Sequence, residues 1–204
     1  MTPTYTPELL SAMLAFAFAA SITPGPNNAM LMASGANFGL RASAAHMSGV
    51  IAGFTVLLTL CGFGLAGVFA AFPPLHALLK WGGAAYLLWL AWKIASAKGI
   101  GAKAAGPRPM TFVAAVGFQF VNPKGWAMAL GAVSAYVPTR AFVANLAVAL
   151  AVFAAVSVFS VLAWTAFGVA LRRFLDRPAA LRAFNVGMAL LLVASLVPLF
   201  TEPG

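Results

Sequence analysis

The segment TPGPNN, at residues 23–28, interrupts a run of uncharged residues that extends from 9 to 38. One continuous helix over this run would be about 45 Å long, whereas the hydrocarbon core of a membrane is about 30 Å thick. Proline removes a backbone N–H and displaces the carbonyl of residue i−4, so Pro24 and Pro26 predict two half-helices or a kink. Backbone groups freed at such a break need a cavity or protein around them, because hydrocarbon cannot satisfy them.

The composition is that of a polytopic membrane protein. Of 204 residues, 63% are hydrophobic and only 7% are charged, whereas a soluble domain has about 25% charged residues. Charges and helix breakers divide the chain into six predicted spans, at residues 9–38, 44–71, 75–94, 110–136, 141–171 and 183–200. Small residues in the first span imitate a signal-peptide cleavage site, but no basic residue precedes it, so we expect this span to be retained.

The excess of basic over acidic residues, twelve to three, indicates topology rather than binding of nucleic acid. Two basic residues, Lys80 and Arg140, lie in loops on one side of the predicted spans, and Lys124 lies inside the fourth span. The other nine lie in loops on the opposite side: Arg41, Lys93, Lys98, Lys103, Arg108, Arg172, Arg173, Arg177 and Arg182. By the positive-inside rule these nine face the cytoplasm, both termini face outward, and anionic lipid adds to the attraction.

A flexible basic segment at residues 96–109 divides the chain into a first half, 1–95, and a second half, 110–204. Each half contains three predicted spans. Because three is an odd number, two halves of the same fold are inserted with opposite orientation, as an inverted repeat. The predicted fold is therefore an all-α membrane protein of six transmembrane helices in two inverted three-helix repeats.

A second break supports the repeat, because NPKG at residues 122–125 falls near the middle of the fourth span, as TPGPNN does in the first. Two broken helices at matching depth in opposite halves predict a substrate site between them. A pair of simple kinks is the structural alternative. The predicted substrate-binding residues are Pro24, Gly25, Pro26, Asn27, Asn28, Gln119, Asn122, Pro123 and Lys124.

Lys124 is the most informative of these residues. An ammonium near the centre of the bilayer costs about 2.5–3.5 kcal/mol or more, so we expect it to face a polar cavity, an anionic ligand or carbonyls freed by Pro123. The alternative is that its side chain reaches an interface. Asn27 and Asn28 are expected to cap the second half of the first span, or to make ordinary interhelical hydrogen bonds. His46 is interpreted as a packing residue, and Gly49 with Gly53 as a close helix contact.

Several kinds of chemistry are disfavoured. Cys61 is the single cysteine, so no internal disulfide forms, and no Cys/His cluster has the spacing of a metal site. No nucleophile–base pair is recognisable either. We expect no metal, no cofactor and no enzymatic activity.

Three stretches, taken together, resemble a known family: TPGPNN at 23–28 followed by SGANFG at 34–39, GAAYLLWLAWK at 83–93, and QFVNPK at 119–124. The family is the lysine exporter and homoserine/threonine exporter family of bacterial amino-acid efflux proteins. Residues 84–96 and 119–122 are most similar to its cysteine/O-acetylserine exporter branch, whereas Pro123 and Lys124 look more like the wider family. The resemblance implies six spans in the bacterial cytoplasmic (inner) membrane and amino-acid export coupled to the proton gradient.

We therefore predict a secondary transporter that exports small neutral amino acids or derivatives of the cysteine, O-acetylserine, homoserine and threonine class. The substrate carboxylate would meet Lys124 and the half-helix near Asn27, and its ammonium would meet carbonyls around Ile22 and Val121. Lys124 is also the candidate for proton coupling, because coupling needs an embedded titratable group.

The three acidic residues, Glu8, Asp176 and Glu202, all lie at span ends or in loops, which argues against a cationic cargo. A basic amino-acid exporter of the same family and a non-transporting membrane subunit are the alternatives. The only other partners expected are membrane lipid and, with no sequence signal for or against it, a second copy of the chain.

Overall fold

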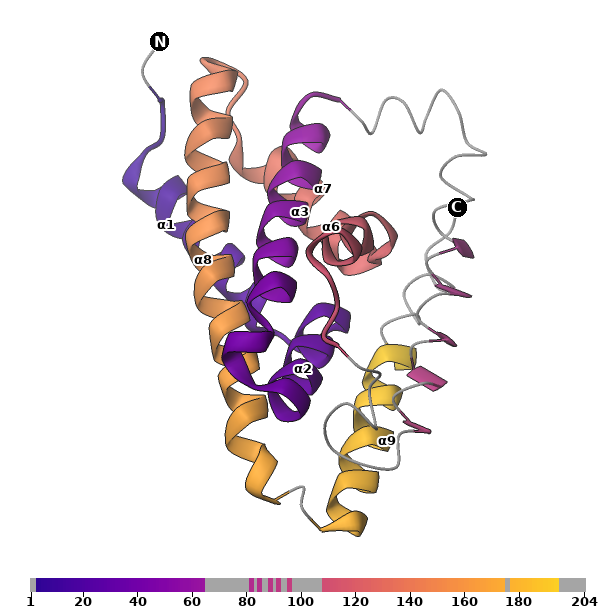
Figure 1. Ribbon diagram of the computed structural model, residues 1–204. Helices are drawn as coiled ribbons and strands as arrows, with labels where there is room; N and C mark the ends of the chain where they lie inside the picture. The colour runs from indigo at the N-terminus through magenta and orange to yellow at the C-terminus, as the bar shows by residue number, and fades with distance from the viewer. Residues whose placement is uncertain are drawn as a thin grey trace.

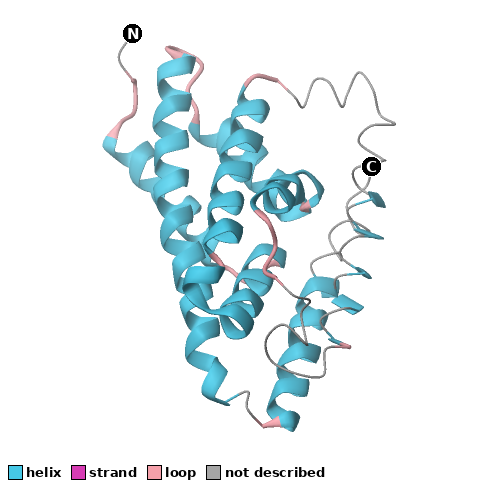
Figure 2. Ribbon diagram, in the orientation of Figure 1, coloured by secondary structure: helices cyan, strands magenta, loops and turns pink. Residues whose placement is uncertain are grey.

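The computed structural model describes residues 3–64, 108–174 and 177–194 and, between the first two ranges, residues 81, 82, 84, 85, 88, 89, 91, 92, 95 and 96. This part of the chain is helical and contains no strand (Figure 2). Its helices are α1 (Pro7–Ile22), α2 (Pro26–Ala42), α3 (Ala44–Gly62), α6 (Phe112–Val121), α7 (Pro123–Tyr136), α8 (Phe142–Leu171) and α9 (Pro178–Ala194), with a 3-10 turn at Arg172–Phe174. The all-helical prediction is confirmed.

The two predicted breaks are present, and proline explains both. Thr23 has an extended backbone, as expected of a residue before proline, and Pro26 is the first residue of α2. In the second break, Asn122 is the extended residue and Pro123 begins α7. The helices α1 and α2 are bent by 55° at their break. Both predicted spans are therefore pairs of half-helices.

Hydrogen-bonding side chains begin the first half of each pair. The Thr6 hydroxyl accepts a bond from the Leu9 N–H at the start of α1, and Thr111 accepts one from Ala114 at the start of α6. Both bonds satisfy backbone donors that the first turn of a helix leaves free. The sequence thus fixes where each half-helix begins as well as where it ends.

The long helix α8 packs against both α1 and α2 (Figure 1). At one end, the Thr4 N–H donates to Asn145 Oδ1 at 2.8 Å, and the Tyr5 hydroxyl donates to the Asn145 carbonyl at 3.2 Å. Asn145 Nδ2 donates back to Thr4 Oγ1 at 3.0 Å. Burial raises the pKa of the Tyr5 phenol, which therefore keeps the proton that it donates.

At the other end, α2 and α8 approach so closely that only glycine fits. A Cβ on Gly35 would lie 2.0 Å from the Thr165 carbonyl oxygen, and a Cβ on Gly168 would lie 2.0 Å from the Met32 carbonyl oxygen. Small residues permit such approach of backbones between membrane helices, where dispersion contacts rather than hydrophobic burial drive packing. The backbones of α2 and α8 are therefore in direct contact at this level.

The predicted close contact at Gly49 and Gly53 is confirmed, and its partner is α6. A Cβ on Gly49 would lie 2.5 Å from the Phe112 carbonyl oxygen, and one on Gly53 would lie 2.8 Å from Val116 Cα. Since α3 and α6 thus begin at the same level, Arg41 and Arg108 lie near one end of the helix bundle. Arg140 lies at the opposite end, where its carbonyl accepts bonds from Thr4 and Asn145.

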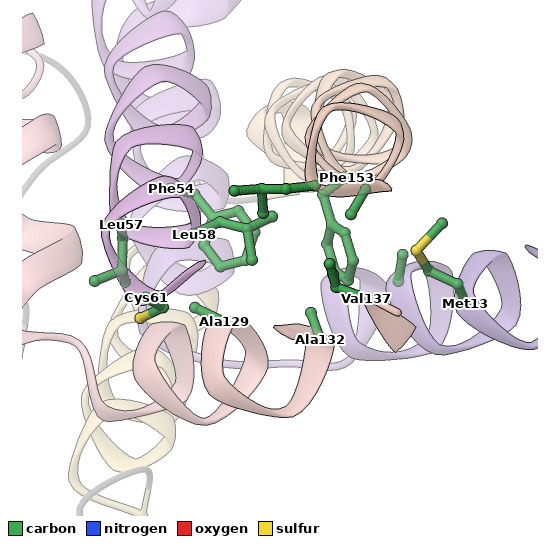
Figure 3. Packing of buried hydrophobic residues seen from close by; sticks show 12 residues of the cluster. Met13, Phe54, Leu57, Leu58, Cys61, Ala129, Ala132, Val137 and Phe153 are labelled. Atoms are coloured by element: carbon green, nitrogen blue, oxygen red, sulfur yellow. The ribbon is translucent and has the colours of Figure 1, made fainter. Parts of the chain in front are cut away.

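The largest apolar cluster joins α1, α3, α7 and α8 (Figure 3). Phe54 of α3 packs against Phe153 of α8, with ring centroids 5.8 Å apart. Phe153 also meets Phe16 of α1 edge to face, and the small residues Ala129 and Ala132 let α7 pack closely against the cluster. This cluster packs one half-helix of each broken pair, α1 and α7, against α3 and α8.

By length and apolar composition, α3 and α8 could each cross a membrane, and the bent pair α1 and α2 could form a third, broken span. Most of the predicted third span, residues 75–94, and of the segment 96–109 lies outside the described residues, as does the end of the sixth span. The six-span inverted repeat and the division at 96–109 stay predictions.

Candidate functional site

The two helix breaks lie against each other in the interior of the bundle. The Lys124 ammonium, from the first turn of α7, donates to the Thr23 carbonyl in the break between α1 and α2. The amides of Asn27 and Gln119 bond reciprocally, at 2.7 Å from Asn27 Nδ2 to Gln119 Oε1 and at 3.1 Å in the other direction. The break in each half is therefore joined to the break in the other half through polar side chains.

Side chains also satisfy carbonyls that the breaks release. Asn28 Nδ2 donates to the Ser21 carbonyl at 2.8 Å and to the Thr23 carbonyl at 2.9 Å. Ser160 Oγ of α8 donates to the same Ser21 carbonyl at 2.9 Å, and the Trp126 indole donates to the Phe120 carbonyl at 2.9 Å. These bonds supply the partners that hydrocarbon lacks.

The structure corrects the prediction that Asn27 and Asn28 cap α2. The residue at the cap position is Gly25, and no side-chain bond is made there. Asn28 instead donates backwards to the end of α1, and Asn27 pairs with Gln119. The physical reason is that the carbonyls at the end of α1 are acceptors and bind the Asn28 amide, while Asn27 makes the interhelical hydrogen bond that was the stated alternative.

A cavity of about 50 Å³ lies between the two breaks, α3 and α8. A water molecule occupies roughly 10–15 Å³ by this measure and about 30 Å³ of liquid volume, so the cavity has room for a few waters or a small solute. Its lining comes from all five surrounding helical segments: Ala20, Ser21, Gly25, Asn27, Asn28, Val50, Phe54, Asn122, Lys124, Gly125, Met128, Ser157, Ser160 and Val161.

Five of the predicted site residues line this cavity, namely Gly25, Asn27, Asn28, Asn122 and Lys124. The other four, Pro24, Pro26, Gln119 and Pro123, do not. The three prolines shape the breaks, and Gln119 is fully buried behind Asn27, which it positions. We predicted that Gln119 lines the same cavity as Lys124. Gln119 does not line it, but its amide is hydrogen-bonded to Asn27, which does.

Ser157 and Ser160, which α8 places in the lining, were not predicted from the sequence. They lie three residues apart in a largely apolar thirty-residue helix, and such spacing puts both hydroxyls on one face. A pair of polar residues on one face of a buried span was the available signal. Ser21, just before the first break, was not predicted either, because only the break itself, at residues 23–28, was considered as a site.

Lys124 carries the one charge in the cavity lining, and none of the lining residues is acidic. Its aliphatic chain passes beside Gly25, where a Cβ would lie 2.8 Å from Lys124 Cδ. The predicted cavity environment of this ammonium is therefore present. Two buried polar atoms of lining residues, Asn122 Oδ1 and Ser21 Oγ, have no hydrogen-bond partner. Buried polar groups are usually paired, so these two oxygens are candidates to receive a donor from a bound solute.

The pairing of Asn27 with Gln119 makes a testable contribution to stability. We expect Gln119→Leu to lower the free energy of unfolding by about 1–3 kcal/mol, because the half-buried Asn27 amide loses both of its hydrogen bonds to Gln119. The double variant with Asn27→Leu should recover part of this loss, since neither partner is then orphaned. Unfolding in mixed micelles measures both, with Ser134→Ala, an exposed hydroxyl bonded within its own helix, as the control. Additive losses would contradict a direct pairing.

Comparison with known proteins identifies relatives over nearly the whole chain. Residues 18–200 match the LysE type translocator family. A "cysteine/O-acetylserine efflux protein" of Salmonella paratyphi A is 35% identical over 198 residues, which cover 96% of this chain and 99% of that protein. The protein of the same name from Escherichia coli K12 is 34% identical over 199 residues, with the same coverage. No solved structure matches the chain.

Proposed function

The chain belongs to the LysE type translocator family, and on this basis we propose that it exports small neutral amino acids or their derivatives across the bacterial inner membrane. As a member of a translocator family it is a transporter and not an enzyme. Cysteine and O-acetylserine, named for the relatives, are the first cargoes to test. Homoserine and threonine are chemically similar candidates.

The observation that carries the proposal is the cavity between two broken helices, with one cationic side chain and no carboxylate in its lining. A zwitterionic amino acid brings a carboxylate that an ammonium attracts. A cationic side chain would instead find no counter-charge, and an unpaired charge at membrane depth is costly. The charge of the site thus favours neutral cargo over lysine or arginine.

We assign the substrate carboxylate to Lys124 and to the start of α2 near Asn27, where free N–H groups carry partial positive charge. The substrate ammonium needs acceptors. The carbonyls of Ser21, Thr23 and Phe120 already accept bonds from side chains, so Asn122 Oδ1 and Ser21 Oγ are added to the carbonyls predicted around Ile22 and Val121. The small side chain of the cargo would lie toward Phe54 and Met128.

Transport by alternating access requires that the two inverted halves rock about this central site, with six spans and both termini outward. The end of the bundle that carries Arg41 and Arg108 would face the cytoplasm, by the positive-inside rule. For proton coupling we propose that Lys124 alternates between the substrate carboxylate and a proton. Membrane lipid would surround the apolar outer faces of the spans.

A panel of radiolabelled amino acids tests the proposal. Cells with and without the protein are preloaded with cysteine, O-acetylserine, homoserine, threonine or lysine, and efflux is followed. We expect faster efflux of one or more neutral amino acids and no change for lysine. The purified chain in proteoliposomes then shows whether it transports alone. Export of lysine without any neutral amino acid would contradict the assigned cargo, and absence of all flux would indicate a non-transporting subunit.

A further inference from the structure

A buried histidine lies between the cavity and the basic end of the bundle. His46 is in the first turn of α3, close in sequence to Arg41, and its side chain is 1% exposed. Val50, one turn further along the same helix, lines the cavity. His46 therefore lies about 6 Å along the helix axis from a residue of the substrate site, on the side that we assign to the cytoplasm.

His46 joins α3 to α2 through a single side-chain bond. Its Nδ1 lies 2.9 Å from Ser34 Oγ, and Ser34 is also buried. Its other ring nitrogen, Nε2, is buried and has no partner. Neutral imidazole has one nitrogen that can take up a proton. Once the ring is protonated, both nitrogens carry a hydrogen, and the N–H at Nε2 has no acceptor in this arrangement.

Within the part of the chain that the structure describes, no charged side chain compensates a proton on His46. The helices that pack against α3 are α2, α6, α7 and α8. Neither α6 nor α8 contains a charged residue. The charged residue of α2 is Arg41, which is exposed at the end of the helix, and the charged residue of α7 is Lys124, which lines the cavity. Arg108, before α6, is exposed, and Glu8, the carboxylate within the described part of the chain, begins α1. An imidazolium here would be an unpaired buried charge, which is costly.

The bond between His46 and Ser34 lies at the level where the backbones of α2 and α8 are in direct contact. Ser34 is followed by Gly35, whose Cα packs on the Thr165 carbonyl, and the next turns of α2 and α8 meet at Gly168. Contacts of α2 with α3 and α8 thus lie between the residues that line the cavity and the end that carries Arg41. His46 is the titratable side chain placed within those contacts.

We propose that His46 is a proton-exchanging residue of the transport cycle and that its protonation opens the contact of α2 with α3 toward the basic end in the empty carrier, whereas the cargo-loaded carrier changes orientation without it. In the closed arrangement the ring is neutral and buried. A proton that the imidazole takes up from the cavity creates an uncompensated charge, which is relieved when α2 and α3 separate and water enters. The proton then leaves toward the cytoplasm, cargo enters from the same side, and the neutral ring permits closure again.

This inference rests on the proposed export function and adds a second group to Lys124. Lys124 touches the cargo, so its loss should impair every mode of transport. His46 does not line the cavity, so its loss should leave cargo binding intact and affect only the step that the proton drives. The two roles are therefore separable by experiment.

The test uses the full chain in proteoliposomes, with radiolabelled L-cysteine kept reduced as the probe and a pH-sensitive dye inside the vesicles. Exchange of labelled for unlabelled cysteine is measured at equal pH on both sides, and efflux is then measured with a pH gradient. For His46→Asn and His46→Gln we expect exchange within about twofold of the unchanged protein. Acceleration by the gradient and cysteine-dependent proton flux should both be lost.

Two matched variants control for damage to the helix contact. Ser34→Ala removes the hydrogen-bond partner but keeps the imidazole, so gradient-driven efflux should persist with a shifted pH profile. Thr165→Val alters a buried hydroxyl at the same level, bonded within its own helix, and should change neither measurement. Retained gradient acceleration in both His46 variants would overturn the inference, as would an equal loss of exchange and driven efflux. Absence of cysteine exchange in the unchanged protein, with every amino acid of the panel also failing, would instead contradict the proposed function.

Discussion

A Lys124→Gln variant is expected to lose both exchange and gradient-driven export of its amino acid. Glutamine keeps a hydrogen-bond donor of similar reach for the Thr23 carbonyl but removes the charge that we assign to the substrate carboxylate. Hydrogen bonds to charged groups contribute about 1.5–3 kcal/mol, so affinity should fall by roughly 10-fold to 150-fold. Cargo exchange and efflux in proteoliposomes, measured over a range of substrate concentrations, check this.

Two further variants make the result specific. Lys124→Arg keeps the charge and should retain measurable exchange, although a guanidinium fits less well beside Gly25. Arg140→Gln removes a positive charge from the exposed loop before α8, where only its backbone carbonyl is bonded, and should have no effect. Full gradient-driven efflux by Lys124→Gln would refute both roles assigned to this lysine.

The second large effect is expected at the crossing of α2 and α8. Gly168→Ala places a methyl group 2.0 Å from the Met32 carbonyl oxygen and 2.9 Å from the Ala36 nitrogen. Backbone atoms cannot move aside as a flexible side chain can, so the two helices must separate. Overpacking of this kind typically costs about 1–3 kcal/mol and sometimes more, and Gly35→Ala should behave alike. Thermal unfolding in detergent and the yield of monodisperse protein measure the loss.

Glycines at which an added Cβ would contact no other atom provide the controls. A Cβ on Gly117 in α6 or on Gly187 in α9 would have no atom within 4 Å. Alanine is the better helix former by about 1 kcal/mol, so Gly117→Ala and Gly187→Ala should leave stability unchanged or raised. Equal stability of all four variants would show that α2 and α8 are not in the contact described.

The helix breaks could be predicted from the sequence because their cause is local. Pro24, Pro26 and Pro123 act on their own backbone and on the residue before them, whatever surrounds the helix. The position of Lys124 in a polar cavity followed from the energetic cost of leaving an ammonium in hydrocarbon. Both inferences needed only the number of residues between charges and the chemistry of one side chain.

The partners across the bundle could not be predicted in the same way. The pairing of Asn27 with Gln119 joins residues 92 positions apart, and nothing in either segment specifies the other. The expected cap by Asn28 was wrong because two acceptors at the end of α1 compete for its amide. Ser157 and Ser160 were overlooked because their role depends on the face that α8 turns toward the breaks.

The bonds from Thr4 and Tyr5 to Asn145 bear on how the protein is assembled. They link positions 141 and 140 residues apart, at the level where α8 begins. A chain made from its N-terminus therefore exposes its first segment long before its partner has been synthesised. The first broken helix therefore lacks these hydrogen bonds until α8 has been synthesised and placed beside it. Truncation before Asn145 should consequently leave the earlier helices inserted but without their native packing.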